Sequence, residues 1–598
     1  MEAARPRTRG RRLRRGTVER PLNARLVRVG FLVVAPAILA FLFSISTTAA
    51  LPRFPLAPLF DAESAASFSE SLTTVYPSRV PGSEGAAEAA RWYRETVGAL
   101  GLETEEDVWT EDLADLGSVE LRNVTTVVPG RSDETIVLVA HRDNAGTEQR
   151  LGENAAGTAI LIELARGFAP QEVGPDPRLQ HTLVLASTDA GAFGGAGAAR
   201  LAAKSPLAQG AIAVVVLDDL TRGRPRLAIA GDDPVSPART LVRTAADRVS
   251  EEVGVSPALP SVASQLVDLG IPFALDEQGR FLAAGLSAVT LTTDSDGETT
   301  AAPATDRLGQ LGRATEALVG SLDTSVGGAF RTPDSIFFSD RAASGWTARL
   351  VLILGVVPFA LGVVDLIVRG RRRALPFRPA LRAQRSRLGV WAFGGFIVAI
   401  GAIGGILPSG APLPLAPYSA SFEQRPVFGI VVLLSLFVLG WLVARRHLVP
   451  AAPATPDERL AGFVVALTTL AIAAIGLAVL QPYALVFVLP SLYAWLWLPL
   501  DGRPAIRAVV FATGLLGPIL GLLLLGHELG LSVLDTMLYV ISLFTVGYLP
   551  LSSALLGIVW VAAATQVGAL SLARYAPYAA GREPPPAGPI RRLVTRSR

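Results

Sequence analysis

The chain of 598 residues contains no cysteine and only four histidines. Without cysteine there can be no disulfide framework, no thiolate metal site and no cysteine nucleophile. Histidine is also absent from the whole stretch between residues 182 and 446. A metal site in the first half of the chain would therefore have to draw most of its ligands from carboxylates.

Charged residues are scarce as well: they make up 18% of the chain, whereas half of it is hydrophobic. Long runs carry no charge, and clusters of arginine lie beside those runs. This pattern is typical of a protein that crosses a membrane several times, because arginine gathers in the cytoplasmic loops. The net charge of +3 gives no reason to expect nucleic acid as a partner. The lipid bilayer is the expected partner instead.

The first 28 residues carry ten arginines and two glutamates, and an apolar run follows them. Residues 29–50 supply the roughly 20 apolar residues that cross a bilayer, so we predict an uncleaved transmembrane anchor with a cytoplasmic N-terminus. A cleaved signal peptide is the alternative, because the run ends in the small residues "STTAA". Residues 51–345 would then form an extracytoplasmic domain of a multi-pass plasma-membrane protein. Residues 346–573 would form the multi-span region, and residues 574–598 a basic cytoplasmic tail.

The multi-span region contains about seven apolar segments that are long enough to cross. Arginine-rich loops such as "RGRRRALPFRPALRAQRSR" follow several of them and mark the cytoplasmic side. We assign one further segment, residues 531–550, as re-entrant or interfacial, because another crossing would place the basic tail outside. The predicted spans are 347–368, 388–407, 427–444, 459–480, 482–500, 507–526 and 552–573.

Short β-branched runs alternate with helical stretches in the predicted outer domain. The pattern predicts a three-layer αβα domain with a mostly parallel sheet. In such sheets ligands bind at the carboxyl ends of the strands, which is where His141, Asp189 and Asp218 fall. The predicted strands are 135–140, 181–188, 211–219 and 286–293, and the predicted helices are 85–101, 156–168, 236–254 and 306–322.

His141 ends a predicted buried strand, and Asp143 follows two residues later. Imidazole is a good zinc ligand, and a neighbouring carboxylate can orient its ring. Glu153 lies in the acidic loop after this strand, Asp189 follows the next strand, and Asp218 follows a third. Packing alone gives no reason for four carboxylates at strand ends, so these residues predict a binding pocket.

The order of these segments resembles that of the M28 family of zinc aminopeptidases. The resemblance implies an aminopeptidase-like fold in which His141 is a zinc ligand supported by Asp143. It also implies that Glu153 replaces the family's bridging aspartate and that Asp218 is a further ligand, with Asp219 as the alternative. The matching stretches cover about residues 75–325: "RVPGSEG", "NVTTVVPG", "IVLVAHRD", "GENAAGTAILIELAR", "LVLASTDAGAFGGAGAARLA" and "AVVVLDDL".

Two positions depart from the family pattern. The family motif Glu-Glu-x-Gly-x-x-Gly-Ser aligns with "TDAGAFGG", which puts Thr188 in place of the general base and Asp189 in place of a zinc ligand. Threonine cannot take a proton from a metal-bound water near neutral pH. The family's last histidine corresponds to Ala302. Three nearby carboxylates could offer oxygen ligands there: Asp294, Asp296 and Glu298.

One metal position remains, formed by His141, Glu153 and Asp218, whereas only Glu153 and Asp189 would hold a second ion. We therefore predict one zinc ion rather than two, with manganese, magnesium or no metal as alternatives. Asp143 would orient His141, and Asp189 would act as a ligand or as the catalytic base.

Two functions fit this pattern. The first is a membrane-bound M28-like metallopeptidase that removes N-terminal residues from peptides, or cleaves a small amide, outside the cytoplasm. The second is a non-catalytic pseudopeptidase that binds a peptide or cell-envelope ligand and couples it to the membrane region. A third, transport through the spans after capture by the outer domain, is disfavoured because the spans lack clear charge pairs.

Overall fold

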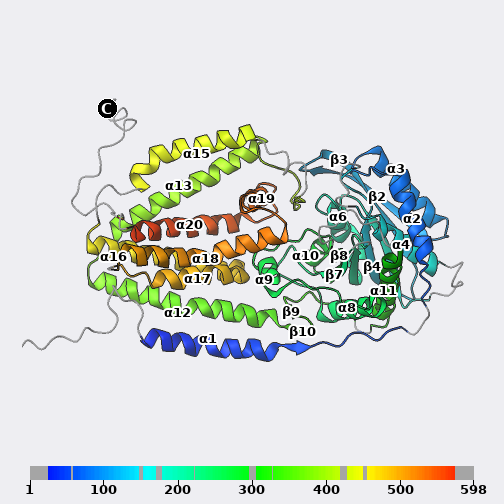
Figure 1. Ribbon diagram of the computed structural model, residues 1–598, viewed down its shortest axis with the longest axis horizontal. Helices are drawn as coiled ribbons and strands as arrows, with labels where there is room; N and C mark the ends of the chain where they lie inside the picture. Colours follow the sequence, from blue (N-terminus) through cyan, green and yellow to red (C-terminus); the bar gives the residue numbers. More distant parts are fainter. Residues whose placement is uncertain are drawn as a thin grey trace, which may run out of the picture.

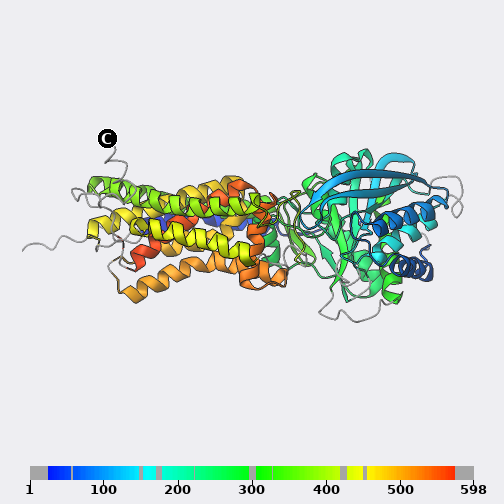
Figure 2. The ribbon, with the colours of Figure 1, turned by 90° about the horizontal axis from the view of Figure 1, so that it is seen from above.

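The computed structural model has two parts arranged end to end (Figure 1). An α/β domain forms one end and a bundle of long helices the other, and Figure 2 shows the same elongated shape from above. We call residues 58–325 the outer domain and residues 345–572 the bundle. The structure describes residues 24–54, 58–146, 153–169, 178–220, 223–294, 305–325, 328–417, 427–448, 454–500, 502–572 and 575.

The middle of the outer domain is a seven-stranded sheet. Its strands are β2 Glu103–Leu113, β3 Gly117–Val128, β4 Ser132–His141, β5 His181–Thr188, β6 Ala211–Leu217, β7 Arg224–Ala228 and β8 Ala288–Asp294. They lie in the order β2-β3-β5-β4-β6-β8-β7. The central strands β5, β4, β6 and β8 are parallel, whereas β2, β3 and β7 pair antiparallel at the two edges. The sheet is therefore mixed, and only its centre has the parallel arrangement that the sequence predicts.

Helices cover both faces of this sheet. They are α2 Ala62–Val75, α3 Glu84–Gly98, α4 Ala155–Phe168, α6 Ala196–Lys204, α7 Pro206–Gln209, α8 Arg239–Val253, α10 Gln278–Ala283 and α11 Thr305–Asp323. A further helix, α9 Val262–Gly270, packs against the bundle instead. Ile136 and Leu138 of β4 pack toward α3, α4, α8 and α11, and Val137 and Val139 pack toward α6 and α10. Burial on both faces accounts for the continuous apolar runs of the central strands. The predicted three-layer architecture is confirmed.

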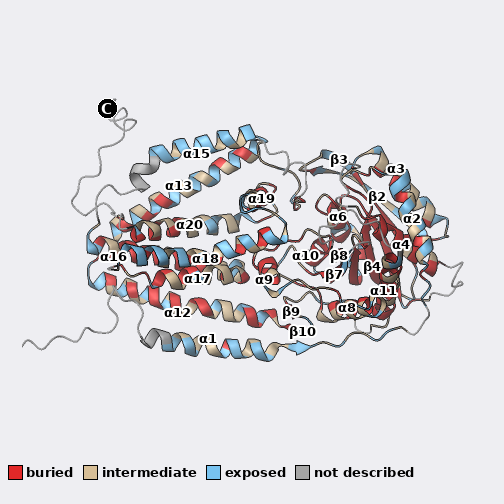
Figure 3. Ribbon diagram, in the orientation of Figure 1, coloured by how far each residue is buried: buried red, intermediate tan, exposed pale blue. Residues whose placement is uncertain are grey.

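The bundle consists of apolar helices. Among the described residues, five are long and apolar enough to cross a membrane: α12 Gly345–Arg372, α13 Phe377–Ile403, α16 Pro456–Leu480, α18 Pro504–Glu528 and α20 Leu551–Ser571. They coincide with five of the predicted spans. Figure 3 shows many exposed residues along these helices, in contrast to the buried sheet, as expected of surfaces that lipid would cover. Four further apolar helices accompany them: α1 Ala24–Ser44, α15 Val427–Leu448, α17 Leu485–Leu496 and α19 Val533–Thr545.

Two contacts join the outer domain to the bundle. The first lies in the connecting segments, where β1 Ser46–Thr47, β10 Arg341–Ala343 and β9 Ile336–Phe338 pair in that order beside α1 and α12. There Ile336 packs with Leu269 of the outer domain and Ala348 of the bundle. The second is an apolar cluster in which Phe273 of the outer domain packs with Leu525 and Tyr539 of the bundle. The rings of Phe273 and Tyr539 meet edge-on at 5.8 Å between centroids. The outer domain therefore rests directly on one end of the bundle.

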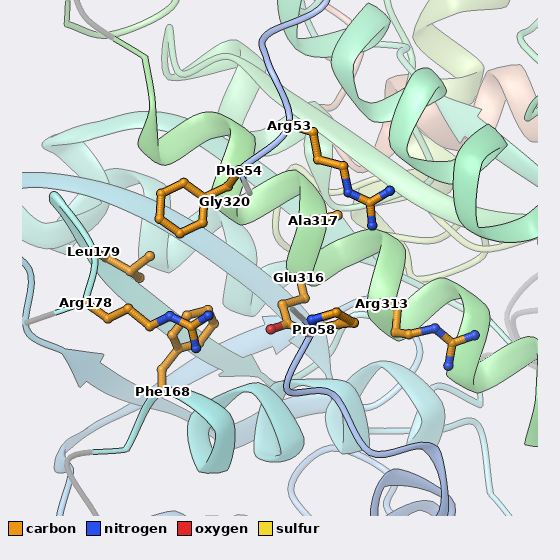
Figure 4. A pocket seen from close by; sticks show the side chains of 10 residues that line it. All are labelled: Arg53, Phe54, Pro58, Phe168, Arg178, Leu179, Arg313, Glu316, Ala317 and Gly320. Carbon is orange, nitrogen blue, oxygen red and sulfur yellow. The ribbon is translucent and has the colours of Figure 1, made fainter. Parts of the chain in front are cut away.

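The segment that precedes α2 is held against α11. Figure 4 shows the pocket between this segment and the helix, where Glu316 lies near Pro58. The Glu316 carboxylate accepts hydrogen bonds from the backbone N–H of Leu59 at 2.9 Å and of Phe60 at 3.0 Å. These two amides would otherwise lack a partner as the segment enters α2, so Glu316 fixes its path.

Replacing Glu316 with alanine is expected to lower the free energy of unfolding by about 1–3 kcal/mol, because it leaves the buried Phe60 amide without an acceptor. Urea unfolding of the full chain in detergent measures the change. Glu63→Ala on the exposed face of α2 is the matched control, with an expected effect near zero. Equal effects of the two substitutions would show that the Glu316 hydrogen bonds do not hold the segment.

Candidate ligand site at the carboxyl edge of the sheet

His141 ends β4 beside Thr188 of the neighbouring strand and is 4% exposed. Its Nδ1 lies 3.3 Å from Asp143 Oδ1, and its Nε2 lies 3.2 Å from Asp218 Oδ1. Burial alone would lower the pKa of His141, but the two carboxylates outweigh burial and raise this pKa well above its usual value. The two carboxylates therefore favour the protonated, positively charged form of His141.

Asp143 is fixed by the loop that follows β5. Its two carboxylate oxygens accept hydrogen bonds from Gly191 N at 2.8 Å and Ala192 N at 3.0 Å. The loop passes so close to the histidine ring that a Cβ at Gly191 would lie 2.2 Å from His141 Cγ. Glycine is therefore required at this position, and the loop holds Asp143 beside His141.

Glu153 is engaged by other partners. Its carboxylate forms an ion pair with Arg79, whose side chain is fully buried. It also accepts hydrogen bonds from Asn144 Nδ2 at 3.0 Å and Ala155 N at 3.1 Å. Arg79 is anchored in turn, because its Nε donates to the backbone oxygen of Arg142 at 2.6 Å. Both oxygens of Glu153 are thus occupied by protein donors.

Asp189 is occupied in the same way and is 2% exposed. Its Oδ2 accepts from Arg122 N at 3.0 Å and from Arg142 Nη2 at 3.3 Å, and its Oδ1 accepts from Ala190 N at 2.9 Å. Burial raises the pKa of Asp189, and the Arg142 guanidinium opposes that rise. The side chain predicted as ligand or base is instead one half of a buried ion pair.

The predicted metal ligands are therefore not brought together. His141 and Asp218 are adjacent, but Glu153 and Asp189 each bind an arginine. Within the described ranges, no group of three or more histidine, aspartate and glutamate side chains is arranged to hold a metal ion. Zinc sites in proteins have at least three protein ligands. The residues present do not fit the zinc ions of the resembled family.

Some predicted positions lie beyond what the structure describes. Asp296, Glu298 and Ala302 fall in residues 295–304, outside the described residues, and the side chain of Asp294 is not described either. Their part in the site stays a prediction.

Glu277, just before α10, was not predicted from the sequence. It is 3% exposed, and its Oε1 accepts a hydrogen bond from Thr188 Oγ1 at 2.8 Å. Burial raises the pKa of Glu277 to about 7, against the lowering effects of His141 and of the Thr188 hydrogen bond. Its second oxygen, Oε2, is buried and has no hydrogen-bond partner among the described residues. The only hint in the sequence is the acid pair Asp276-Glu277 ahead of a short helix.

The carboxyl group of Glu277 thus lies beside Thr188, the residue aligned with a glutamate in the resembled family. Glu277 follows Thr188 by 89 positions in the chain. The site consequently combines a histidine, its two aspartate partners and a buried glutamate with one oxygen that has no hydrogen-bond partner among the described residues. Such a set can bind and orient a polar ligand by charge and hydrogen bonds.

Comparison with known proteins identifies a family for part of the chain. Residues 123–295 match Peptidase family M28, which confirms the resemblance carried by the sequence motifs. No curated protein matches the chain.

Several solved structures are similar to part of this chain. Glutaminyl cyclase from an Acidobacteriales bacterium is 18% identical, with a TM-score of 0.35, and the match covers 46% of this chain and 98% of that protein. A leucine aminopeptidase precursor from Bacteroides thetaiotaomicron is 14% identical, with a TM-score of 0.34 and coverage of 45% and 99%. A Zn-dependent exopeptidase from Parabacteroides distasonis is 16% identical, with a TM-score of 0.32 and coverage of 44% and 99%.

Proposed function

We propose, taking residues 123–295 as a segment of Peptidase family M28, that the outer domain is a ligand-binding pseudopeptidase. It would recognise a peptide, a small amide or another polar envelope ligand and would not hydrolyse it by the family's zinc chemistry. The observation that carries this proposal is that Glu153 forms an ion pair with Arg79 and Asp189 forms an ion pair with Arg142.

Two features of these ion pairs support the proposal. Arg79 and Arg142 are almost completely buried, so each guanidinium must keep a partner, because an unpaired buried charge costs several kcal/mol. A metal ion at Glu153 or Asp189 would have to displace a guanidinium and would leave that arginine unpaired. The arginines therefore supply the positive charge that metal ions would otherwise bring.

The bundle would hold this domain at a membrane. Five helices are long and apolar enough to cross a bilayer, and arginine clusters beside the apolar runs favour a cytoplasmic location for those loops. The outer domain lies at one end of the bundle (Figure 1). We infer that it lies outside the cytoplasm at the plasma membrane, where a bound ligand would act on the bundle through the direct contact between the two parts.

One observation favours a second candidate, a hydrolase that uses one metal ion. His141 Nε2 and Asp218 Oδ1 are 3.2 Å apart, a separation that two ligands of one ion can have, and Asp143 holds the other ring nitrogen. In such an enzyme Glu153 would have to break its ion pair with Arg79 before it could bind the metal ion. The catalytic base would have to be a residue other than Thr188, which stands at the family's base position.

Activity of the full chain separates the two candidates. The chain is purified in detergent without chelator, supplied with zinc and incubated with leucine p-nitroanilide. We expect no release of p-nitroaniline above that of the His141→Ala variant, because no described set of residues holds the metal. Zinc-dependent turnover that His141→Ala abolishes would contradict the binding function and favour the one-metal hydrolase.

A further inference from the structure

The loop that follows β5 connects the ligand site with the bundle. We call residues 190–195 the site loop. Its backbone amides hold the Asp143 carboxylate, and it passes directly against the His141 ring. Ala190 has a φ of 55°, and two glycines of the loop also have positive φ. Alanine rarely adopts such a backbone conformation, which persists only where the surrounding structure enforces it.

The first contact that holds the site loop comes from the bundle. Residues 411–416 follow α13, and we call them the bundle loop. The Ala411 amide donates to the backbone oxygen of Asp112, near the end of β2, at 2.8 Å. A Cβ at Gly194 would lie 2.5 Å from Pro414 O. The bundle loop therefore lies against the site loop with no space between their backbones.

Side chains extend this contact on both sides. Leu413 of the bundle loop packs in one apolar cluster with Phe193 and Ala190 of the site loop. Leu415 packs in the junction cluster with Tyr539 of α19, and the Tyr539 hydroxyl donates to Leu415 O at 2.5 Å. The bundle loop is thus fixed to a bundle helix at one end and to the site loop at the other.

Arg280 of α10 joins the site loop to the bundle a second time. Its Nε donates to Gly194 O at 3.2 Å, and it forms an ion pair with Asp232. The Tyr548 hydroxyl, from the turn between α19 and α20, donates to Asp232 at 2.7 Å. The guanidinium carbon of Arg280 lies 5.6 Å from the centroid of the Tyr548 ring. Because Arg280 is 6% exposed, water cannot readily replace these partners.

We propose that Tyr548 and Leu413 of the bundle are positioning residues of the ligand site, which hold the site loop in its strained conformation. The inference rests on the proposed binding function and names the residues through which the bundle controls the ligand site. Coupling between two sites is reciprocal. A ligand that shifts the site loop therefore also shifts the balance of contacts at the bundle loop and at Tyr548.

Hydrogen–deuterium exchange of the full chain in detergent tests this role. Tyr548→Phe keeps the ring and removes the hydroxyl that donates to Asp232 and accepts from Ala274 N at 3.2 Å. Exchange of the backbone amides of residues 190–197 is expected to become about tenfold faster, because the loop then opens at a lower cost in free energy. Amides of the central strands β6 and β8 should exchange as in the wild-type chain.

Two further variants make the result specific. Tyr493→Phe is the matched control, because the Tyr493 hydroxyl donates to Gly355 O at 2.6 Å within the bundle; it should leave the site loop unchanged. Leu413→Ala weakens the other contact and is expected to speed exchange of the same amides by about tenfold. If Tyr548→Phe does not fold, Leu413→Ala supplies the test by itself.

Three results would overturn the inference: unchanged exchange of the site loop in both variants, an equal effect of Tyr493→Phe, or equal acceleration of the site loop and the central strands. The last would show that the contacts stabilise the whole domain and do not position the loop. The proposed function fails separately, because zinc-dependent hydrolysis of leucine p-nitroanilide would contradict it whatever the exchange rates are.

Discussion

Replacing Arg142 with methionine is expected to lower the free energy of unfolding by about 3–5 kcal/mol, the range found when one partner of a buried ion pair is removed. Arg142 is 1% exposed and donates to Ser187 O at 2.9 Å as well as to Asp189. The substitution would leave the Asp189 carboxylate buried with only backbone donors. Amide hydrogen exchange of β4 and β5 in the full chain measures the loss.

Two further variants make this result specific. Arg142→Met combined with Asp189→Asn should recover part of the loss, because the second change removes the unpaired charge. Arg200→Met breaks the half-exposed ion pair between Arg200 and Asp107 and should cost less than about 1 kcal/mol. If Arg142→Met were no more destabilising than Arg200→Met, the Arg142–Asp189 pair could not be what keeps Asp189 from other partners.

Replacing Glu277 with glutamine is expected to change how stability depends on pH. The pKa of Glu277 is about 7 in the folded chain against an ordinary value of 4.5. Between these two values the folded state holds a proton that the unfolded state has released, so the wild-type chain loses stability as pH rises from about 4.5 to 7. The loss amounts to about 3 kcal/mol at most, and it is absent from the variant.

The measurement is the difference in unfolding free energy between Glu277→Gln and wild type at pH values from 5 to 8. The difference should move in favour of the variant as pH rises and level off above pH 7, because other titrating groups are common to both chains. The exposed Glu103→Gln variant should show no such trend. A difference that is independent of pH would mean that Glu277 is not a buried, protonated acid.

The general architecture could be predicted from sequence because it depends on periodicity. Buried β-branched runs predicted β4, β5, β6 and β8, and the positions at which these runs end placed His141, Asp189 and Asp218 at one edge of the sheet. Length and hydropathy likewise located the five long helices of the bundle. The antiparallel strands β2, β3 and β7 were missed, because strands with exposed residues carry a weaker apolar signal.

The partners within the site could not be predicted, because they depend on side chains that meet only after folding. Arg79 is separated from Glu153 by 74 residues and Arg142 from Asp189 by 47. The motifs show a carboxylate at each position but do not show whether a metal or a guanidinium neutralises it. Glu277 was missed for the same reason, since Thr188 alone gives no indication that a carboxyl group arrives from elsewhere.

Zinc stoichiometry tests the central claim most directly, which is that arginines occupy the carboxylates that would otherwise bind metal. The full chain, its His141→Ala variant and its Glu153→Ala variant are dialysed against zinc and then buffer, and bound zinc is counted by mass spectrometry. The account predicts that all three retain the same background amount, well below one ion per chain. One zinc ion per wild-type chain, lost in both variants, would contradict it.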